Sequence, residues 1–186
     1  MKIACVILAG GKSSRMQKDK TMLPFGGYKT LCEYQYNKMK ELFEKVYIST
    51  KDPKKFNFKA DYILDNTTEF APTYALDSIM QNLDEDFFFV MAVDMPFLNK
   101  SVVQKLLNEF DANKDAIVAT NGDEIHTLCA IYSKKIHPQI KELIKENRHK
   151  LQRFLKEIDT KYVPIDEDDA FVNLNYPHEY EEALKR

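Results

Sequence analysis

The chain has 186 residues, of which 44% are hydrophobic, and its 27 Lys and Arg against 29 Asp and Glu leave a formal charge of -2. This length supports one ordinary core, so we expect residues 1–186 to form a single domain. The balanced charge argues against the broad basic surface of a nucleic-acid binder. The longest apolar run, residues 87–93, is too short to cross a membrane. With no signal-peptide pattern at the start, we expect a soluble, cytoplasmic protein.

The cysteines and histidines show no pattern of a disulfide framework or a zinc site. Cys5, Cys32 and Cys129 lie far apart without a Cys-x-x-Cys pair, so we interpret them as reduced packing residues. The four histidines likewise lack the spacing of structural metal ligands.

The first half of the chain alternates short apolar runs with helical patterns. Residues 3–8 form a β-branched run that ends at Ala9-Gly10-Gly11, which predicts a buried strand leading into a glycine turn. A helix is expected over 31–43, strands over 46–48 and 62–64, and a helix over 74–82. Residues 87–93 are the clearest buried strand, and Asp94 and Pro96 end it.

The second half begins with a helical stripe over 102–110. Residues 116–119 and 127–132 are strand candidates around Asn121-Gly122, a pair that favours a turn with positive φ, and they could form an antiparallel ribbon. Two helical stripes follow over 136–144 and 151–158, and Pro177 begins a last helix that reaches Leu184. Alternating strands and helices predict a three-layer α/β/α sandwich with a mostly parallel sheet.

The glycine turn after the first strand has the character of an anion site. In open α/β sheets the ligand lies beyond the carboxyl ends of the strands, where this turn is expected. Gly10 and Gly11 lack Cβ atoms, so their backbone N–H groups could approach a phosphate, and Arg15 and Lys20 follow as cations. An ordinary connecting turn with solvated lysines is the alternative, and the spacing matches neither the Walker loop nor the dinucleotide-binding fingerprint.

Asp94 is the second candidate, because it follows the most apolar strand and would project into the same crevice. One carboxylate that faces a basic triphosphate loop suits magnesium, which is held by one or two protein carboxylates together with phosphate oxygens. The alternative is that Asp94 only caps the turn before Pro96.

Several segments, in order along the whole chain, resemble one family. They are Leu8-Ala-Gly-Gly, Arg15-Met16, Asp19-Lys20, Val93-Asp-Met-Pro, His126-Thr-Leu-Cys-Ala-Ile-Tyr, and Phe171-Val-Asn-Leu-Asn followed by Pro177. They are similar to the molybdenum cofactor guanylyltransferases, the molybdopterin-guanine dinucleotide biosynthesis branch of the nucleotidyltransferase superfamily. The opening segment is shared across that superfamily, whereas the Phe-x-Asn-x-Asn ending narrows the resemblance to the molybdopterin branch.

The resemblance implies a Rossmann-like nucleotidyltransferase sheet and transfer of GMP from GTP to the phosphate of molybdopterin, with magnesium as cofactor. It also implies molybdoenzyme maturation proteins as partners. By the same resemblance, Arg15 and Lys20 would bind the triphosphate, and Asp94 would bind the metal with Asn175, or less favourably Asn173, nearby. The remaining nucleotide contacts would come from Leu8, Ala9, Gly10, Gly11, Ser49 and Asp65.

The sequence indicates the residues that would bind the acceptor substrate less clearly. Arg148, His149, Lys150 and Arg153 form a basic cluster where the family has a basic segment thought to face the pterin, although a solvated helix face would have the same composition. His126 aligns roughly with a histidine that the family often places before a strand. We therefore carry His126, Arg148 and Arg153 forward as candidate pterin-side residues.

The chain departs from the family near the base and before the last helix. Ala71-Pro72-Thr73-Tyr74-Ala75 replaces the usual Gly-Pro-Leu-Ala-Gly, and Tyr176 replaces a Thr whose hydroxyl would cap the helix. The altered segment leaves open a cytidylyltransferase or a sugar-phosphate nucleotidyltransferase. A third reading is a non-catalytic nucleotide- or pterin-binding protein of molybdoenzyme maturation.

Overall fold

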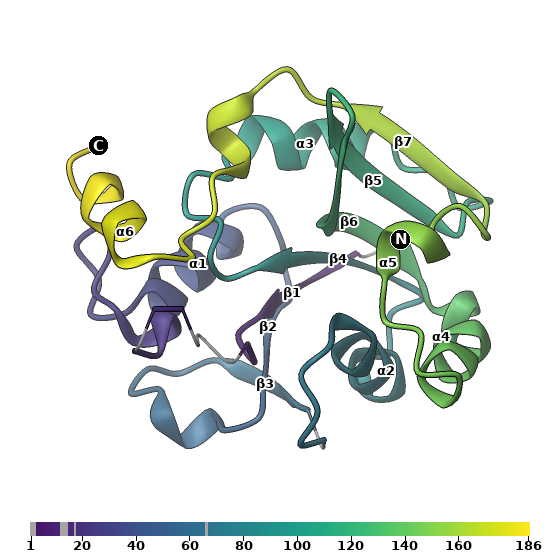
Figure 1. Cartoon of the computed structure of the whole chain (residues 1–186), viewed down its shortest axis with the longest axis horizontal. Coiled ribbons are helices and arrows are strands. Elements are labelled where there is room, and N and C mark those ends of the chain that lie inside the picture. The colour runs from purple at the N-terminus through teal and green to yellow at the C-terminus, as the bar shows by residue number, and fades with distance from the viewer. Residues whose placement is uncertain (1–2, 12–14, 17, 66) are drawn as a thin grey trace.

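The computed structural model describes residues 3–11, 15–16, 18–65 and 67–186. Within them one seven-stranded sheet forms, with strand order β3-β2-β1-β4-β6-β5-β7 (Figure 1). The strands are β1 Ala4–Leu8, β2 Val46–Thr50, β3 Asp61–Leu64, β4 Phe87–Ala92, β5 Ala116–Asn121, β6 Glu124–Ser133 and β7 Thr160–Pro164. The helices are α1 Leu31–Lys40, α2 Pro72–Asn82, α3 Lys100–Asn108, α4 His137–Lys145, α5 Leu151–Phe154 and α6 Pro177–Ala183.

The sheet is mostly parallel, as the sequence predicts. β1 pairs in parallel with β2 and β4, β2 with β3, and β5 with β7, while β6 runs antiparallel to β4 and β5. The predicted antiparallel ribbon is therefore β5–β6, and Gly122 at its turn has the expected positive φ of 54°. Because β1 to β4 are parallel neighbours, their carboxyl ends lie at one edge of the sheet, where polar residues follow them.

Two hydrophobic clusters, one on each face of the sheet, make the three layers. One cluster joins the sheet to α1, α3 and α6, and the other joins it to α2, α4 and α5 (Figure 1). Alternate residues of β4 supply both: Phe89 and Met91 point into the first cluster, and Phe88 and Val90 into the second. Burial on both faces explains why this strand is a continuous apolar run.

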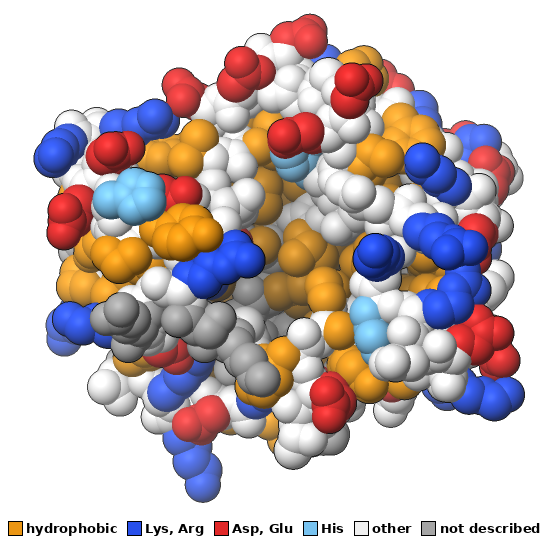
Figure 2. Space-filling model, viewed as in Figure 1, with side chains coloured by type: hydrophobic (Ala, Val, Ile, Leu, Met, Phe, Trp, Pro, Cys, Tyr) orange, Lys and Arg blue, Asp and Glu red, His pale blue; other side chains and the backbone are white. Residues whose placement is uncertain are grey.

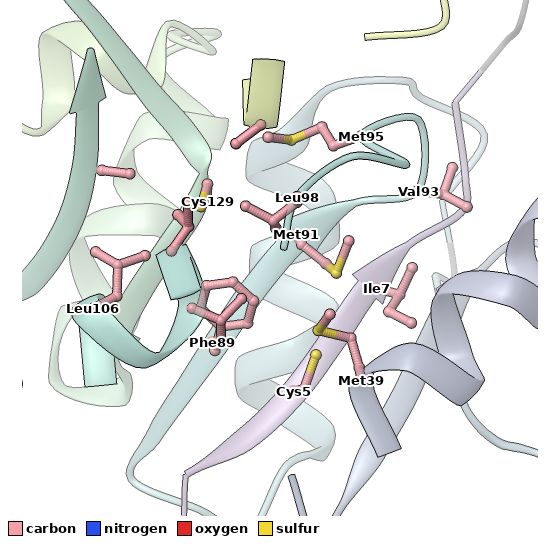
Figure 3. Close-up of a cluster of buried hydrophobic side chains, with 14 of the residues drawn as sticks. Cys5, Ile7, Met39, Phe89, Met91, Val93, Met95, Leu98, Leu106 and Cys129 are labelled. Atoms are coloured by element: carbon pink, nitrogen blue, oxygen red, sulfur yellow. The ribbon is translucent and has the colours of Figure 1, made fainter. Parts of the chain in front are cut away.

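All three cysteines are free and buried, in agreement with their interpretation as packing residues. Cys5 and Cys129 lie in the first cluster beside Met91 and Phe89 (Figure 3). Burial raises the pKa of each thiol, to about 12 for Cys32. The thiols therefore stay protonated at neutral pH.

The helix boundaries follow local capping chemistry. Thr30 Oγ1 accepts a hydrogen bond from Glu33 N at 3.0 Å at the start of α1, and Asn99 Oδ1 accepts from Val102 N at 3.0 Å at the start of α3. At α6 the side chain of Tyr176 makes no capping bond, as its replacement of Thr predicts. Glu179 compensates, because its Oε2 accepts from the backbone N–H groups of Asn175 at 2.6 Å and Tyr176 at 2.9 Å.

Several predicted boundaries were wrong. The stripe over 151–158 is only a single helical turn, α5, after which the chain enters β7, a strand that sequence reasoning missed. β7 is an edge strand whose burial does not alternate, so it lacks a clear period-2 pattern. The helix predicted over 31–43 ends at Lys40, and β4 ends at Ala92 rather than Val93.

Candidate active site

A cavity of about 290 Å³ opens at the carboxyl ends of β1, β2, β3 and β4; we call it the main cavity. It is lined by Leu8, Gly10, Gly11, Lys20, Thr21, Ser49, Lys51, Asp65, Glu69, Phe70, Ala71, Pro72, Ala75, Ala92, Val93, Asp94 and Leu128. Seven of the predicted nucleotide-binding positions are among these residues: Leu8, Gly10, Gly11, Lys20, Ser49, Asp65 and Asp94. Four segments far apart in sequence meet here because their strands are neighbours in the sheet.

The glycine turn is held against the neighbouring strands by its backbone. Ala9 N donates to Ser49 O at 2.8 Å, and Val93 N donates to Leu8 O at 3.1 Å, which extends the ladder past the strand ends. Ala9 itself is buried and does not line the cavity. A Cβ on Gly10 would lie 3.8 Å from Asp65 Oδ2, and a Cβ on Gly11 would have no atom within 4 Å. Gly11 thus borders open space, whereas Gly10 faces the side chain of Asp65 at ordinary contact distance.

Asp94 has one carboxylate oxygen engaged and one without a protein partner. Its Oδ2 forms an ion pair with Lys20 Nζ, and that ammonium also donates to Asn175 Oδ1 at 3.3 Å. Its Oδ1 is buried with no hydrogen-bond partner among the described residues. Three residues predicted from separate motifs therefore meet at one point. A buried oxygen without a partner is costly unless a ligand satisfies it.

A divalent metal fits this arrangement. Asp94 and Asn175 contribute hard oxygen donors, and the unpartnered Oδ1 offers a ligand position. Among the residues that the structure describes, no three His, Cys, Asp or Glu side chains gather as a metal-binding group. Magnesium is typically coordinated by one or two protein oxygens together with substrate phosphate oxygens, a pattern that this arrangement fits better than the pattern of a zinc site.

A second cavity of about 330 Å³, the asparagine cavity, lies next to the first. Its lining residues are Ala92, Asp94, Met95, Ile125, His126, Thr127, Leu128, Asn173 and Asn175. Asp94 lines both cavities, so its carboxylate lies at their shared wall. Any group that it binds can contact ligands on either side.

His126 faces the asparagine cavity from β6. Its ring stacks on Phe171 with centroids 3.7 Å apart, and its Nε2 is buried without a partner in the described part of the chain. Burial lowers the pKa of this imidazole below its usual value, so the ring is neutral at pH 7. A neutral imidazole with an unsatisfied nitrogen can donate to or accept from a polar ligand.

A third cavity of about 580 Å³, the basic cavity, adjoins the other two through shared wall residues. Pro72 is common to it and the main cavity, and Ile125 and Thr127 are common to it and the asparagine cavity. Lys150, Arg153 and Lys156 supply its positive charge, with Asp123 and His149 also in the wall. Figure 2 shows this face of the molecule with a hollow near its middle and basic side chains on both sides.

Arg148 is not among the residues that line these three cavities. It is paired with Glu157 and, at 3.0 Å, with Glu146, whereas Arg153 lines the basic cavity and lies 3.6 Å from Glu157. Arg15 lies with its guanidinium 5.7 Å from the centroid of the Tyr176 ring and does not line the main cavity. Gln17, which stands where the resembled family usually has a glycine after Arg15-Met16, lies outside the described residues.

Sequence reasoning missed Lys51 in the main cavity. Its Nζ lies 3.3 Å from Asp65 Oδ2, donates to the carbonyls of Thr67 and, at 2.7 Å, Glu69, and lies 4.8 Å from the centroid of the Phe70 ring. Lys51 follows β2 directly, so the strand-end rule could have found it.

The segment that departs from the family lies between the main and basic cavities. Thr73 Oγ1 is 2.6 Å from His149 Nδ1, and the Tyr74 ring lies 5.0 Å from the His149 ring. His149 Nε2 is also 2.9 Å from Asn147 Oδ1. The altered residues thus connect the start of α2 to the basic loop.

Comparison with known proteins identifies the family. The model of the MobA-like NTP transferase domain matches residues 5–162. A molybdenum cofactor guanylyltransferase of Campylobacter jejuni subsp. doylei is 36% identical, over 95% of this chain and 93% of its own. One from Helicobacter pylori strain G27 is 29% identical, over 98% and 92%.

A solved structure has the same fold. The molybdopterin-guanine dinucleotide biosynthesis protein A of Archaeoglobus fulgidus superposes with a TM-score of 0.84 at 21% identity, covering 98% of this chain and 97% of that one. With the family model matching most of the sequence, this chain belongs to the MobA-like NTP transferase family.

Proposed function

We propose that residues 1–186 act as one nucleotidyltransferase domain that transfers GMP from GTP to the phosphate of molybdopterin and releases pyrophosphate. The family and the names of the relatives support nucleotidyl transfer and this pair of substrates. The observation that carries the proposal is the position of Asp94, whose carboxylate lies at the shared wall of two cavities with one oxygen unpartnered. Transfer of a group between two substrates requires both to be bound next to the same catalytic group.

We further propose that the metal is magnesium, bound by Asp94 with Asn175 nearby. Bound there, it would neutralise phosphate charge and orient the reacting groups. Lys20 already lies at this point and would bind the phosphates, with Arg15 joining it on the pyrophosphate side. The backbone N–H groups of Gly10 and Gly11 would donate further hydrogen bonds to the phosphates.

The reaction needs no general base from the protein. A phosphate monoester has a second pKa of about 6, so the acceptor is already mostly ionised at neutral pH. One of its oxygens attacks the α-phosphorus of GTP, and the bond from that phosphorus to the bridging oxygen breaks as pyrophosphate leaves with the electron pair. Positioning and charge stabilisation are then what the protein supplies.

For the acceptor we propose the asparagine and basic cavities. His126, Asn173 and Asn175 offer polar contacts in the first, and Lys150, Arg153 and Lys156 offer positive charge in the second. An anionic pterin would find polar groups beside Asp94 in the asparagine cavity and positive charge in the adjoining basic cavity.

The test is thermal stabilisation by GTP, CTP, ATP and UTP, each with and without magnesium. Ligand at about 100 times its dissociation constant adds about 2.7 kcal/mol. We expect a shift with GTP that magnesium enlarges, followed by formation of the dinucleotide when molybdopterin is added. A shift with CTP alone would favour a cytidylyltransferase. Segment 71–75, where this chain departs from the family, borders the main cavity and so could change which base binds there. Nucleotide binding without turnover would favour a carrier.

A further inference from the structure

Helix α1 has one buried side chain that carries an amide, namely Gln35. Its buried residues are Leu31, Cys32, Gln35 and Met39, and Gln35 is 0% exposed. A buried amide is unfavourable unless its polar atoms are hydrogen-bonded. Gln35 Oε1 is buried without a hydrogen-bond partner among the described residues, so the bonds of its Nε2 are what this amide contributes to the core.

Gln35 binds the two carbonyls that flank Asp94. Its Nε2 donates to Val93 O at 3.1 Å and to Met95 O at 2.8 Å. One turn along α1, Lys38 Nζ donates to Pro96 O at 2.7 Å. Both donors come from one face of one helix, because they are three residues apart.

The opposite side of the turn is held as well. Leu174 N donates to Asp94 O at 2.9 Å, so the carbonyls of residues 93, 94, 95 and 96 all accept hydrogen bonds from elsewhere in the fold. The side chains of Val93 and Met95 are buried in the first hydrophobic cluster, where Met95 lies near Leu98 (Figure 3). The main chain on both sides of Asp94 is thus held, while its Oδ1 has no hydrogen-bond partner among the described residues.

We propose that Gln35 and Lys38 are positioning residues that hold the Asp94 carboxylate at the wall between the main and asparagine cavities. This inference rests on the proposed function, since it concerns the geometry of the carboxylate that would bind the metal. Residues that orient a metal ligand affect metal affinity and turnover by roughly 10- to 100-fold when they are replaced.

The first experiment replaces Gln35→Met, which keeps the length of the side chain and removes both donors. We expect kcat at saturating GTP and magnesium to fall roughly tenfold, because the carboxylate is no longer held in place, while the triphosphate contacts of other residues are untouched. Asn37→Leu is the matched control, since Asn37 lies on the same helix and donates to Glu33 O within it at 2.8 Å. This control should keep full turnover.

Lys38 is tested in the same way. Lys38→Met should lower kcat, and Lys38→Arg should recover most of it, because a guanidinium can also donate to the Pro96 carbonyl. Lys40→Met is the control, since Lys40 is exposed on α1. A Lys38→Met variant as active as this control would overturn the role of Lys38.

A double-mutant cycle separates positioning from simple loss of folded protein. In an Asp94→Asn background, Gln35→Met should cost nothing further in kcat, because the carboxylate that it positions is gone. A loss equal to that in the wild-type background would overturn the inference and assign Gln35 a purely structural role.

A binding measurement supplies a readout besides turnover. Titration calorimetry of GTP with and without magnesium should show that Gln35→Met lowers the magnesium-dependent gain in affinity roughly tenfold and leaves metal-free binding unchanged. Equal weakening of both would overturn the inference. If the wild-type chain binds another nucleotide instead of GTP, the proposed substrate fails, and the same comparison made with that nucleotide still decides the role of Gln35.

Discussion

At the scale of single residues, the site depends on one carboxylate and its surroundings. Asp94 pairs one carboxylate oxygen with Lys20, which also donates to Asn175, and its other oxygen is buried without a hydrogen-bond partner among the described residues. The three residues come from the ends of the sequence and its middle, and they meet because β1 and β4 are neighbours and Leu174 N bonds to Asp94 O. Charge, rather than a nucleophile or base, is what this site provides.

We predict that Asp94→Asn retains the fold and lowers turnover at least ~10²-fold, the scale of a lost charge-stabilising group. Steady-state kinetics with magnesium and GTP measure the loss, and circular dichroism checks the fold. Asp84→Asn, at an exposed position, is the control and should stay fully active. Turnover of Asp94→Asn close to that of wild type would contradict the assignment of Asp94 as the metal carboxylate.

At the scale of elements, α1 connects the core to the site. Its apolar side chains pack on the sheet, and the side chains of Tyr34, Gln35 and Lys38 donate to carbonyls of the turn after β4. The Lys38 ammonium also lies 4.8 Å from the centroid of the Tyr34 ring. Burial lowers the pKa of Lys38 from 10.5 to about 7.

This pKa predicts a pH-dependent stability. Below about pH 7 the folded and unfolded chains both hold the Lys38 proton, so Lys38 does not make the free energy of unfolding change with pH. Between about 7 and 10.5 the unfolded chain binds the proton and the folded chain has released it, so the free energy of unfolding rises with pH. The slope is at most about 1.4 kcal/mol per pH unit.

Urea unfolding of wild type and Lys38→Met at pH 7, 8 and 9 checks this expectation. Their difference isolates Lys38 from the cysteines and tyrosines, which titrate in both proteins. The stability of wild type relative to the variant should increase over this range. A difference that does not vary with pH would show that Lys38 keeps an ordinary pKa in the folded chain.

At the scale of the whole molecule, the central strand β4 supports both faces of the sheet. Phe89 is fully buried and stacks on Phe43 with ring centroids 5.5 Å apart. Among the described helices, none is long and apolar enough to span a membrane. The apolar run of β4 is therefore accounted for by the core.

We predict that Phe89→Ala lowers the free energy of unfolding by about 3–5 kcal/mol, because it removes a large buried ring and leaves a cavity. Leu64→Ala is the control, since Leu64 is 44% exposed on the edge strand β3 and should cost far less. Chemical denaturation of both variants measures the difference. Equal costs would mean that the core collapses around the Phe89 site.

The sequence by itself determined the three-layer class, most of the strands and the order of the motifs. Continuous apolar runs and helical stripes depend on local periodicity, which can be recognised from the sequence alone. It also placed Ser49, Asp65 and Asp94 at strand ends, and all three line the main cavity. Their roles in binding nucleotide and metal stay predictions.

Only the tertiary structure decided how these residues meet. β7 was missed, and the helix at α5 was predicted too long, because edge pairing and the end of a helix depend on neighbours far away in sequence. Arg148 and Arg153 look alike in sequence, yet one is paired with two glutamates and the other lines the basic cavity. The bonds from Gln35 to the Asp94 turn join residues about sixty positions apart. No local pattern carries such contacts, because chain topology alone brings their partners together.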